Sequence, residues 1–178
     1  YAAPERMQRM DARILKEELG CDIVRTSHYP QSRHFISECD RLGLLVFTEI
    51  PGWQHIGDKE WKERVINNTK EMVLQYRNHP SVIIWGVRIN ESQDDDEFYK
   101  KTNETAHALD PTRPTSGVRY IENSSLLEDI YSYNDFSHTG NNSGVKEKIK
   151  VTKHQDKPLL VSEANGHMFP TKSFDTWE

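Results

Sequence analysis

The fold is decided by the stretch Ser81-Val82-Ile83-Ile84-Trp85-Gly86-Val87-Arg88-Ile89-Asn90-Glu91. Its apolar residues follow Pro80, lack helical spacing and stop at an Asn-Glu pair. This pattern predicts a buried strand of a parallel sheet. Parallel α/β folds collect their chemistry at the carboxyl ends of the strands, where side chains leave the core and face a crevice. Glu91 is therefore predicted to lie in such a crevice.

The rest of the chain alternates segments of strand and helical character. Five further strands are predicted, at 21–26, 44–49, 115–120, 129–134 and 157–163. Helices are predicted at 6–19, 32–41, 58–77, 94–109 and 145–154, and a polar loop at 137–144. This βαβ rhythm predicts one α/β domain over residues 1–178, built on a parallel sheet. Eight such strands would close a (β/α)8 TIM barrel.

The composition excludes several classes of protein. With 35% hydrophobic and 29% charged residues, the chain of 178 residues is globular. Its net charge of -5, spread along the chain, argues against nucleic acid as a partner. No apolar run is long enough to cross a membrane, so we expect a soluble protein, and the sequence leaves open whether it is cytoplasmic or periplasmic. Cys21 and Cys39 lack the spacing of a zinc site or a disulfide framework. Because the chain starts at Tyr1, we expect a piece of a longer protein.

Glu91 and Glu163 each stand at the end of a predicted strand. Counted along the sheet, these strands lie three apart, so the two side chains are expected to face each other across the mouth of a barrel. Cleavage of a glycosidic bond needs such a pair, because one carboxyl group protonates the leaving oxygen while the other meets the positive charge at the anomeric carbon. The alternative is that both are exposed loop residues.

Side chains near the predicted strand ends favour a sugar site. Asn90 offers an amide for a sugar hydroxyl. Trp53 and Trp85 offer flat faces for pyranose rings, while the alternative for either Trp alone is a place in the core. Arg25 ends the first predicted strand, where its charge would keep a neighbouring carboxylate ionised. His28 follows in the same loop and is predicted to be a hydrogen-bonding residue.

Several longer motifs occur together. They are Arg-Thr-Ser-His-Tyr-Pro at 25–30, Asp-Arg-Leu-Gly-Leu-Leu-Val at 40–46, His-Pro-Ser-Val-Ile-Ile-Trp at 79–85 before Asn90 and Glu91, Asp-Pro-Thr-Arg-Pro at 110–114, and Pro-Leu-Leu-Val-Ser-Glu at 158–163. In this order they resemble glycoside hydrolase family 2, which contains β-galactosidases, β-glucuronidases and β-mannosidases. The resemblance covers nearly the whole chain. Segments 131–138 and 162–170 are more similar to bacterial β-galactosidases than to glucuronidases.

The resemblance implies a (β/α)8 catalytic barrel that retains anomeric configuration. Matching the strands in order gives barrel strands two to seven, so we expect an incomplete barrel that lacks the first and eighth. These two strands are neighbours in a closed barrel, so their loss would leave one gap and two unpaired edges. We therefore expect little or no hydrolase activity from these 178 residues alone.

The resemblance also implies roles for the residues at the strand ends. Glu91 would be the general acid/base, with a raised pKa, and Glu163 the nucleophile, with the carboxyl groups about 5 to 5.5 Å apart. Asn90 would bind the sugar 2-hydroxyl and Arg25 would support the nucleophile. The further substrate-binding residues implied are His28, Asn134 and Trp53.

Three positions depart from the family pattern. Ala164 follows Glu163, where an aromatic residue is common. Trp53 and His55 occupy the region in which some members hold magnesium with a Glu and a His, and the Glu is missing, so no metal and no cofactor is expected. Phe136 stands near the place of a tyrosine that usually touches the nucleophile, which leaves Tyr133 as the candidate.

Other functions remain open at this point. A carbohydrate-binding or scaffold module without catalysis is one, favoured by Ala164 and the missing strands. A metal-assisted barrel enzyme using Glu49, His28 and His55 is another. On the leading hypothesis the partner is a carbohydrate resembling a β-galactoside, with no nucleic acid and no membrane, and the full-length enzyme is a homo-oligomer. The sequence leaves open the choice between galactose, glucuronic acid and mannose.

Overall fold

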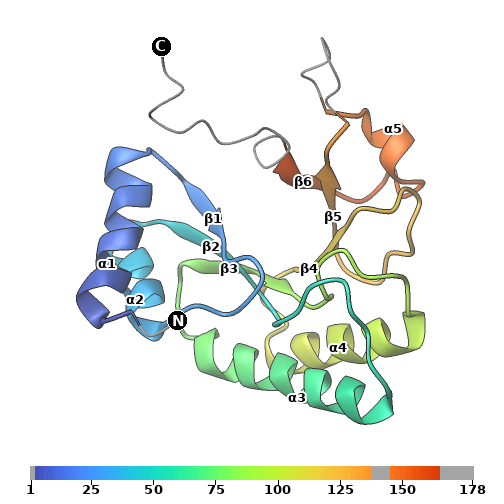
Figure 1. The fold of residues 1–178 in the computed structure, drawn as a ribbon, viewed down its shortest axis with the longest axis horizontal. Helices are drawn as coiled ribbons and strands as arrows, with labels where there is room; N and C mark the ends of the chain where they lie inside the picture. The colour runs from blue at the N-terminus through green and yellow to red at the C-terminus, as the bar shows by residue number, and fades with distance from the viewer. Residues whose placement is uncertain (1–2, 138–144, 165–178) are drawn as a thin grey trace, which may run out of the picture.

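A six-stranded parallel sheet forms the centre of the computed structural model, which describes residues 3–137 and 145–164 (Figure 1). Strands that follow each other in the chain are also neighbours in the sheet. They are β1 (Ile23–Arg25), β2 (Leu45–Glu49), β3 (Val82–Gly86), β4 (Thr115–Arg119), β5 (Ile130–Asp135) and β6 (Leu159–Ala164). The prediction of an α/β fold with a partial TIM barrel is confirmed. The predicted loop at 137–144 falls almost wholly on residues 138–144, and segments 131–138 and 162–170 fall partly on 138 and 165–170, all outside the described residues.

Helices cover the outer side of the curved sheet (Figure 1). They are α1 (Glu5–Arg13), α2 (Arg33–Leu42), α3 (Lys59–Tyr76), α4 (Asp96–Leu109) and the short α5 (Lys148–Val151). The single helix predicted at 6–19 is instead α1 followed by a π-helical turn, η1 (Ile14–Glu18). A loop rather than a helix joins β4 to β5. None of the described helices is long and apolar enough to cross a bilayer.

Side-chain caps set the starts of the longer helices. Ser32, Asp58 and Asp95 accept hydrogen bonds from backbone N–H groups in the first turns of α2, α3 and α4. These bonds satisfy donors that a helix start leaves without intrahelical partners. The predicted start of α4 at Asp94 is therefore wrong by two residues: Asp95 is the cap, and Asp94 instead accepts from Arg88 at 2.7 Å. Gly43 ends α2 in a left-handed conformation with φ 66°.

The main core lies between the sheet and helices α1 to α4. Trp85 is its largest fully buried side chain, with 0% exposure. Its indole Nε1 donates to Asp110 Oδ2 at 3.0 Å, and the Arg113 guanidinium lies 5.7 Å from the ring centroid. The prediction that Trp85 offers a face for a sugar is wrong, because its alternation on β3 points it at the helices rather than into the barrel.

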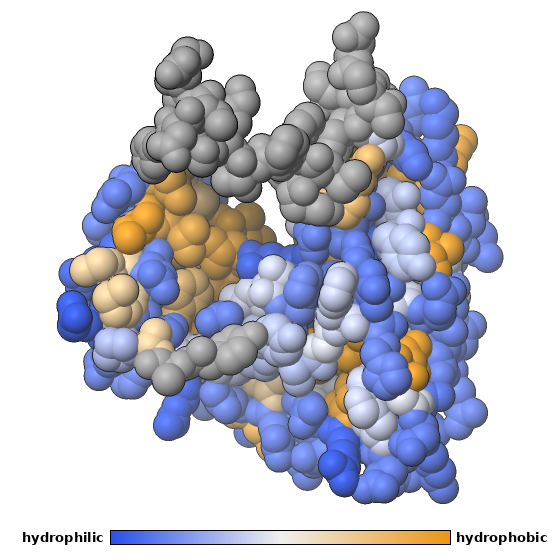
Figure 2. Space-filling view, viewed as in Figure 1, coloured by the Kyte–Doolittle hydropathy of each residue, from blue (hydrophilic) through white to orange (hydrophobic). Residues whose placement is uncertain are grey.

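The inner face of the sheet encloses a second, smaller cluster. Phe47, Ile84 and Val118 are buried there, with Leu160 of β6 packed against them. At the carboxyl end, Arg25 of β1 donates to Glu163 of β6 at 2.5 Å. The sheet therefore curves into a nearly closed barrel, and this side-chain contact links its first and last strands, which are not paired with each other. Figure 2 shows hydrophobic side chains along one flank of the hollow between the two ends of the sheet.

The central strand is shorter than predicted. β3 ends at Gly86 rather than running to Glu91. Beyond Gly86 the chain stays buried but loses regular pairing, keeping isolated contacts such as the bond from Val87 N to Ser116 O at 2.8 Å. Glu91 then adopts a left-handed conformation with φ 54°. A run of apolar residues indicates burial, but it does not show where the ladder of hydrogen bonds stops.

A buried carboxylate joins the first two helices. The Glu38 side chain is 2% exposed and lies 2.7 Å from Arg13 Nε and 2.6 Å from Arg41 Nη2. Hydrogen bonds from Arg41 and Arg13 lower the pKa of Glu38 from 4.5 to about 2. Arg13 and Arg41 are themselves more than half exposed, at 53% and 56%. Solvent therefore screens part of the attraction.

Glu38→Gln is expected to destabilise the full-length protein by about 1–2 kcal/mol at neutral pH, because the arginines lose their charged partner. A carboxylate whose pKa is lower in the folded than in the unfolded protein stabilises the fold at pH values above its unfolded pKa. This stabilisation is lost as the pH falls through the folded pKa. The difference in unfolding free energy between the unmodified protein and Glu38→Gln should therefore shrink as the pH falls from 4.5 to about 2. Urea unfolding measures it at several pH values. Glu5→Gln, at an ion-paired carboxylate that is 53% exposed, is the control and should change stability by less than about 0.5 kcal/mol.

Candidate active site

Arg25 is the centre of a charged cluster at the carboxyl ends of the strands. Its Nε and Nη2 donate to Glu49 at 3.2 and 3.0 Å, and its Nη1 donates to Glu163 Oε1 at 2.5 Å. Nη2 also donates to Asn90 Oδ1 at 2.6 Å. The Arg25 side chain is only 10% exposed. One guanidinium therefore orients side chains from the ends of β2 and β6 and from the segment after β3.

Glu49 is a site residue that the sequence analysis considered only as a metal ligand. It is 1% exposed and ends β2, in register with Gly86 of β3. A Cβ on Gly86 would lie 2.3 Å from the Glu49 Cβ, so glycine is needed for the carboxylate to lie there. His28 Nδ1 lies 3.5 Å from Glu49 Oε1 and 3.2 Å from Arg25 Nη2. The available signal was positional, because Glu49 ends a predicted strand just as Glu163 does.

Glu91 is held by three N–H donors from two directions. Asn134 Nδ2 on β5 donates to Oε1 at 3.0 Å. Trp53 Nε1 and Gln54 Nε2, in the loop after β2, donate to Oε2 at 3.1 and 3.2 Å. Gln54 carries no signal in the sequence, since a single polar residue in a loop is unremarkable.

The pKa of Glu91 is lowered, contrary to the raised value that its predicted role implies. Burial raises the pKa of this carboxyl group, but the hydrogen bonds from Asn134, Trp53 and Gln54 and the nearby His28 outweigh burial. Donors to a carboxylate favour the ionised form. The three N–H donors therefore favour the ionised form of Glu91.

Asn134 and Asn90 connect the two predicted catalytic glutamates. Asn134, which bonds Glu91, is paired in register with Glu163 on the neighbouring strand β6. Asn90 precedes Glu91 and shares Arg25 with Glu163. Among the described residues, the buried Asn90 Nδ2 has no hydrogen-bond partner. The structure brings all seven predicted site residues into one network: Glu91, Glu163, Asn90, Arg25, His28, Asn134 and Trp53.

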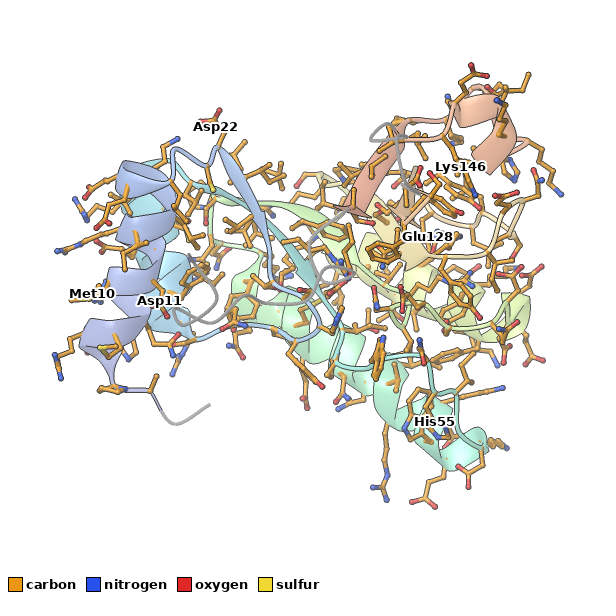
Figure 3. All side chains as sticks on the ribbon, turned by 45° about the horizontal axis from the view of Figure 1, so that its top comes forward. Met10, Asp11, Asp22, His55, Glu128 and Lys146 are labelled. Atoms are coloured by element: carbon orange, nitrogen blue, oxygen red, sulfur yellow. The ribbon has the colours of Figure 1, made fainter. Side chains whose placement is uncertain are left out.

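Other candidates lie elsewhere. His55 packs edge-on against Trp61 of α3, with ring centroids 5.6 Å apart, and Figure 3 shows it beside that helix. Within the described ranges, no three His, Cys, Asp or Glu residues are grouped to hold a metal ion. Tyr133 packs with Tyr131 and Val151 on the α5 side of the sheet. The prediction that its hydroxyl touches the nucleophile is therefore wrong, because alternation along β5 turns it away from the site.

The chain has a parallel, nearly closed barrel with a cluster of carboxylates at the carboxyl ends of its strands. This arrangement is typical of (β/α)8-barrel proteins, which carry their functional sites at that end. The family model described as glycosyl hydrolases family 2, TIM barrel domain, matches residues 3–175. The chain belongs to this family, as the sequence motifs predicted.

Individual relatives agree with the family. The chain is 60% identical to a β-galactosidase of Thermoanaerobacterium thermosulfurigenes over 100% of its own length and 25% of that protein. It is 56% identical to a β-galactosidase of Thermoanaerobacter pseudethanolicus over 98% of its length and 22% of that protein. The solved β-glucuronidase 3 of Bacteroides uniformis superposes with a TM-score of 0.68 and 35% identity, covering 76% of this chain and 18% of that one. The chain thus spans about a quarter of the length of these relatives.

Proposed function

We propose that the full-length protein hydrolyses terminal non-reducing β-galactosides by a retaining double displacement, with Glu163 as nucleophile and Glu91 as general acid/base. One observation carries this proposal. Asn134 bonds Glu91 and pairs with Glu163, while Arg25 bonds Glu163 and Asn90, so both glutamates belong to one network at the strand ends. A pair of carboxylates that can act on one acetal is what glycoside hydrolysis requires.

The reaction proceeds in two steps. In the first, a Glu163 oxygen attacks the anomeric carbon and the bond to the aglycone oxygen breaks, while Glu91 gives its proton to that oxygen. In the second, Glu91 takes a proton from water as the water oxygen attacks the anomeric carbon and Glu163 leaves. Two inversions at one carbon retain its configuration, and Glu91 ends protonated for the next cycle.

The neighbouring side chains have supporting roles. Arg25 offsets the charge of Glu163 and orients it, and Glu49 on its other side orients Arg25. Asn90 Nδ2 has no hydrogen-bond partner in the part of the chain that the structure describes, so it is available to donate to a sugar 2-hydroxyl. Trp53 is 58% exposed, so its ring face is open to stack on a sugar or aglycone.

The choice of galactose rests on the relatives. The proteins with 60% and 56% identity are named β-galactosidase, whereas a putative β-glucuronidase of Formosa agariphila is 33% identical. Greater similarity over the same segment favours the galactosidase specificity.

A substrate panel tests the proposal. The full-length protein should hydrolyse a nitrophenyl β-galactoside with a kcat/KM at least about tenfold above that for the matching β-glucuronide and β-mannoside, the discrimination that contacts to a single substituent provide. Proton NMR of the first product should show the β anomer. Saturable galactose binding without hydrolysis would instead establish a carbohydrate-binding module, and a preference for the glucuronide would overturn the specificity.

A further inference from the structure

The geometry around Glu91 points to a role for Gln54, and this inference rests on the proposed function. We propose that Gln54 is a positioning residue that holds Glu91 in its ionised, base form and so sets the pH range in which the enzyme can use Glu91 as an acid. Gln54 would act through Glu91 and would not touch the reacting atoms.

The loop after β2 is fixed against the segment that carries Glu91. Gln54 N donates to Asn90 O at 2.8 Å, and Trp53 forms an isolated parallel bridge with Asn90. Gly52, with φ 148°, allows close packing, because a Cβ there would lie 2.7 Å from Ile89 Cδ1. The position of Gln54 relative to Glu91 is thus set by the backbone of both segments.

Both residues adopt an uncommon backbone conformation. Gln54 has φ 60° and Glu91 has φ 54°, in the left-handed region that non-glycine residues rarely occupy. Such conformations are strained and persist where surrounding contacts impose them, often at functional sites. Here the two outliers face each other and are joined by a hydrogen bond from Gln54 Nε2 to Glu91 Oε2.

The chemistry of the three donors separates Gln54 from the others. Asn134 Oδ1 accepts from Ser162 Oγ, which fixes its amide nitrogen toward Glu91. The Trp53 indole can only donate, but its exposed ring is also suited to contact substrate. Gln54 is exposed and presents its amide N–H to an oxygen that already accepts from Trp53. Its N–H therefore adds stabilisation to the ionised carboxylate.

Other charged groups lie in the same network. His28, in the loop after β1, lowers the pKa of Glu91. Arg25 at the end of β1 donates to Glu49 on β2, to Glu163 on β6 and to Asn90, the neighbour of Glu91. A change at Gln54 leaves all of these groups in place. The comparison of Gln54 variants with the unmodified protein therefore isolates the contribution of this one donor.

The test is the pH profile of kcat/KM with an alkyl β-galactoside, whose poor leaving group needs an acid. The alkaline limb reports loss of the proton from the acid. In Gln54→Leu the Glu91 carboxylate loses a hydrogen-bond donor, so Glu91 keeps its proton to higher pH. The alkaline limb should therefore move up by about half to one pH unit. In Gln54→Lys a charged donor is supplied, and the limb should stay in place or move down. An upward shift in Gln54→Leu without an upward shift in Gln54→Lys would distinguish an effect on the protonation of Glu91 from general damage to the site.

Two controls complete the experiment. Gln93→Leu removes an exposed glutamine in the Glu91-bearing segment that bonds Tyr120 instead, and it should leave the limb unmoved. Glu91→Ala should lose the alkaline limb; if it keeps that limb, the proposed acid role itself fails. If Glu91→Ala behaves as expected but Gln54→Leu does not move the limb up, or Gln54→Lys moves it up as well, the role of Gln54 is overturned and the proposed function stands.

Discussion

Glu163→Gln in the full-length protein is expected to lower turnover of a nitrophenyl β-galactoside by about 10⁴-fold or more. Removing a nucleophile leaves only the catalysis that binding and electrostatics provide, and losses of this size are observed for single nucleophiles in other hydrolases. The amide is a poor nucleophile, so no glycosyl-enzyme can form at a useful rate. Steady-state kinetics over a range of substrate concentrations measure the loss.

The structure explains why this variant should fold. A glutamine at this position keeps an oxygen that can accept from Arg25 Nη1, and Arg25 keeps its bonds to Glu49 and Asn90. The thermal midpoint and galactose binding should therefore stay near those of the unmodified protein. Glu147→Gln, which alters an exposed carboxylate paired with Lys150, is the matched control. Activity of Glu163→Gln within tenfold of that control would contradict the nucleophile assignment.

Glu91→Ala is expected to lower kcat/KM for an alkyl β-galactoside by about 10²–10⁴-fold, the range that general acid catalysis supplies. A dinitrophenyl galactoside should still form the glycosyl-enzyme readily, because its leaving group needs no proton. Hydrolysis of this glycosyl-enzyme then becomes slow, since no base activates water. Azide needs no base and should restore turnover, giving the β-galactosyl azide.

The configuration of the azide product separates the two glutamates. If azide replaces the missing base in Glu91→Ala, it attacks the intermediate on Glu163 and retains the β configuration. In Glu163→Ala azide would instead replace the nucleophile and give the α product. The Glu91 assignment is wrong if azide neither accelerates Glu91→Ala nor yields the β-azide.

The sequence predicted the fold well because burial on both faces leaves a local signature. Six short apolar runs, separated mostly by amphipathic segments, correspond to β1–β6 in order. Capping residues such as Ser32 and Asp58 marked helix starts because their side chains bond the backbone directly. The predictions failed where backbone hydrogen bonding, rather than residue composition, decides the end of an element. β3 stops at Gly86, and the end of the first predicted helix is the π-helical turn η1.

At the site, the sequence identified residues that follow strands and carry distinctive chemistry, such as Glu91, Glu163 and Arg25. It misjudged Trp85, since the face to which a strand residue points depends on register with both neighbours. It did not find Gln54, which carries no local pattern, and it valued Glu49 only as a metal ligand. The sequence implied a raised pKa for Glu91, whereas the structure lowers it. The N–H donors responsible come from two other segments of the chain, so no local pattern indicates them.

By itself, the sequence determined the parallel α/β architecture and the family, because strand burial, helix capping and family motifs are written in neighbouring residues. Only the tertiary structure decided which side chains meet: Arg25 with Glu163 from opposite ends of the sheet, and Gln54 with Glu91 from adjacent loops. Hydrogen bonds and charge interactions act over a few ångströms in space, whatever the separation along the chain. Protonation at this site is therefore a property of the folded barrel.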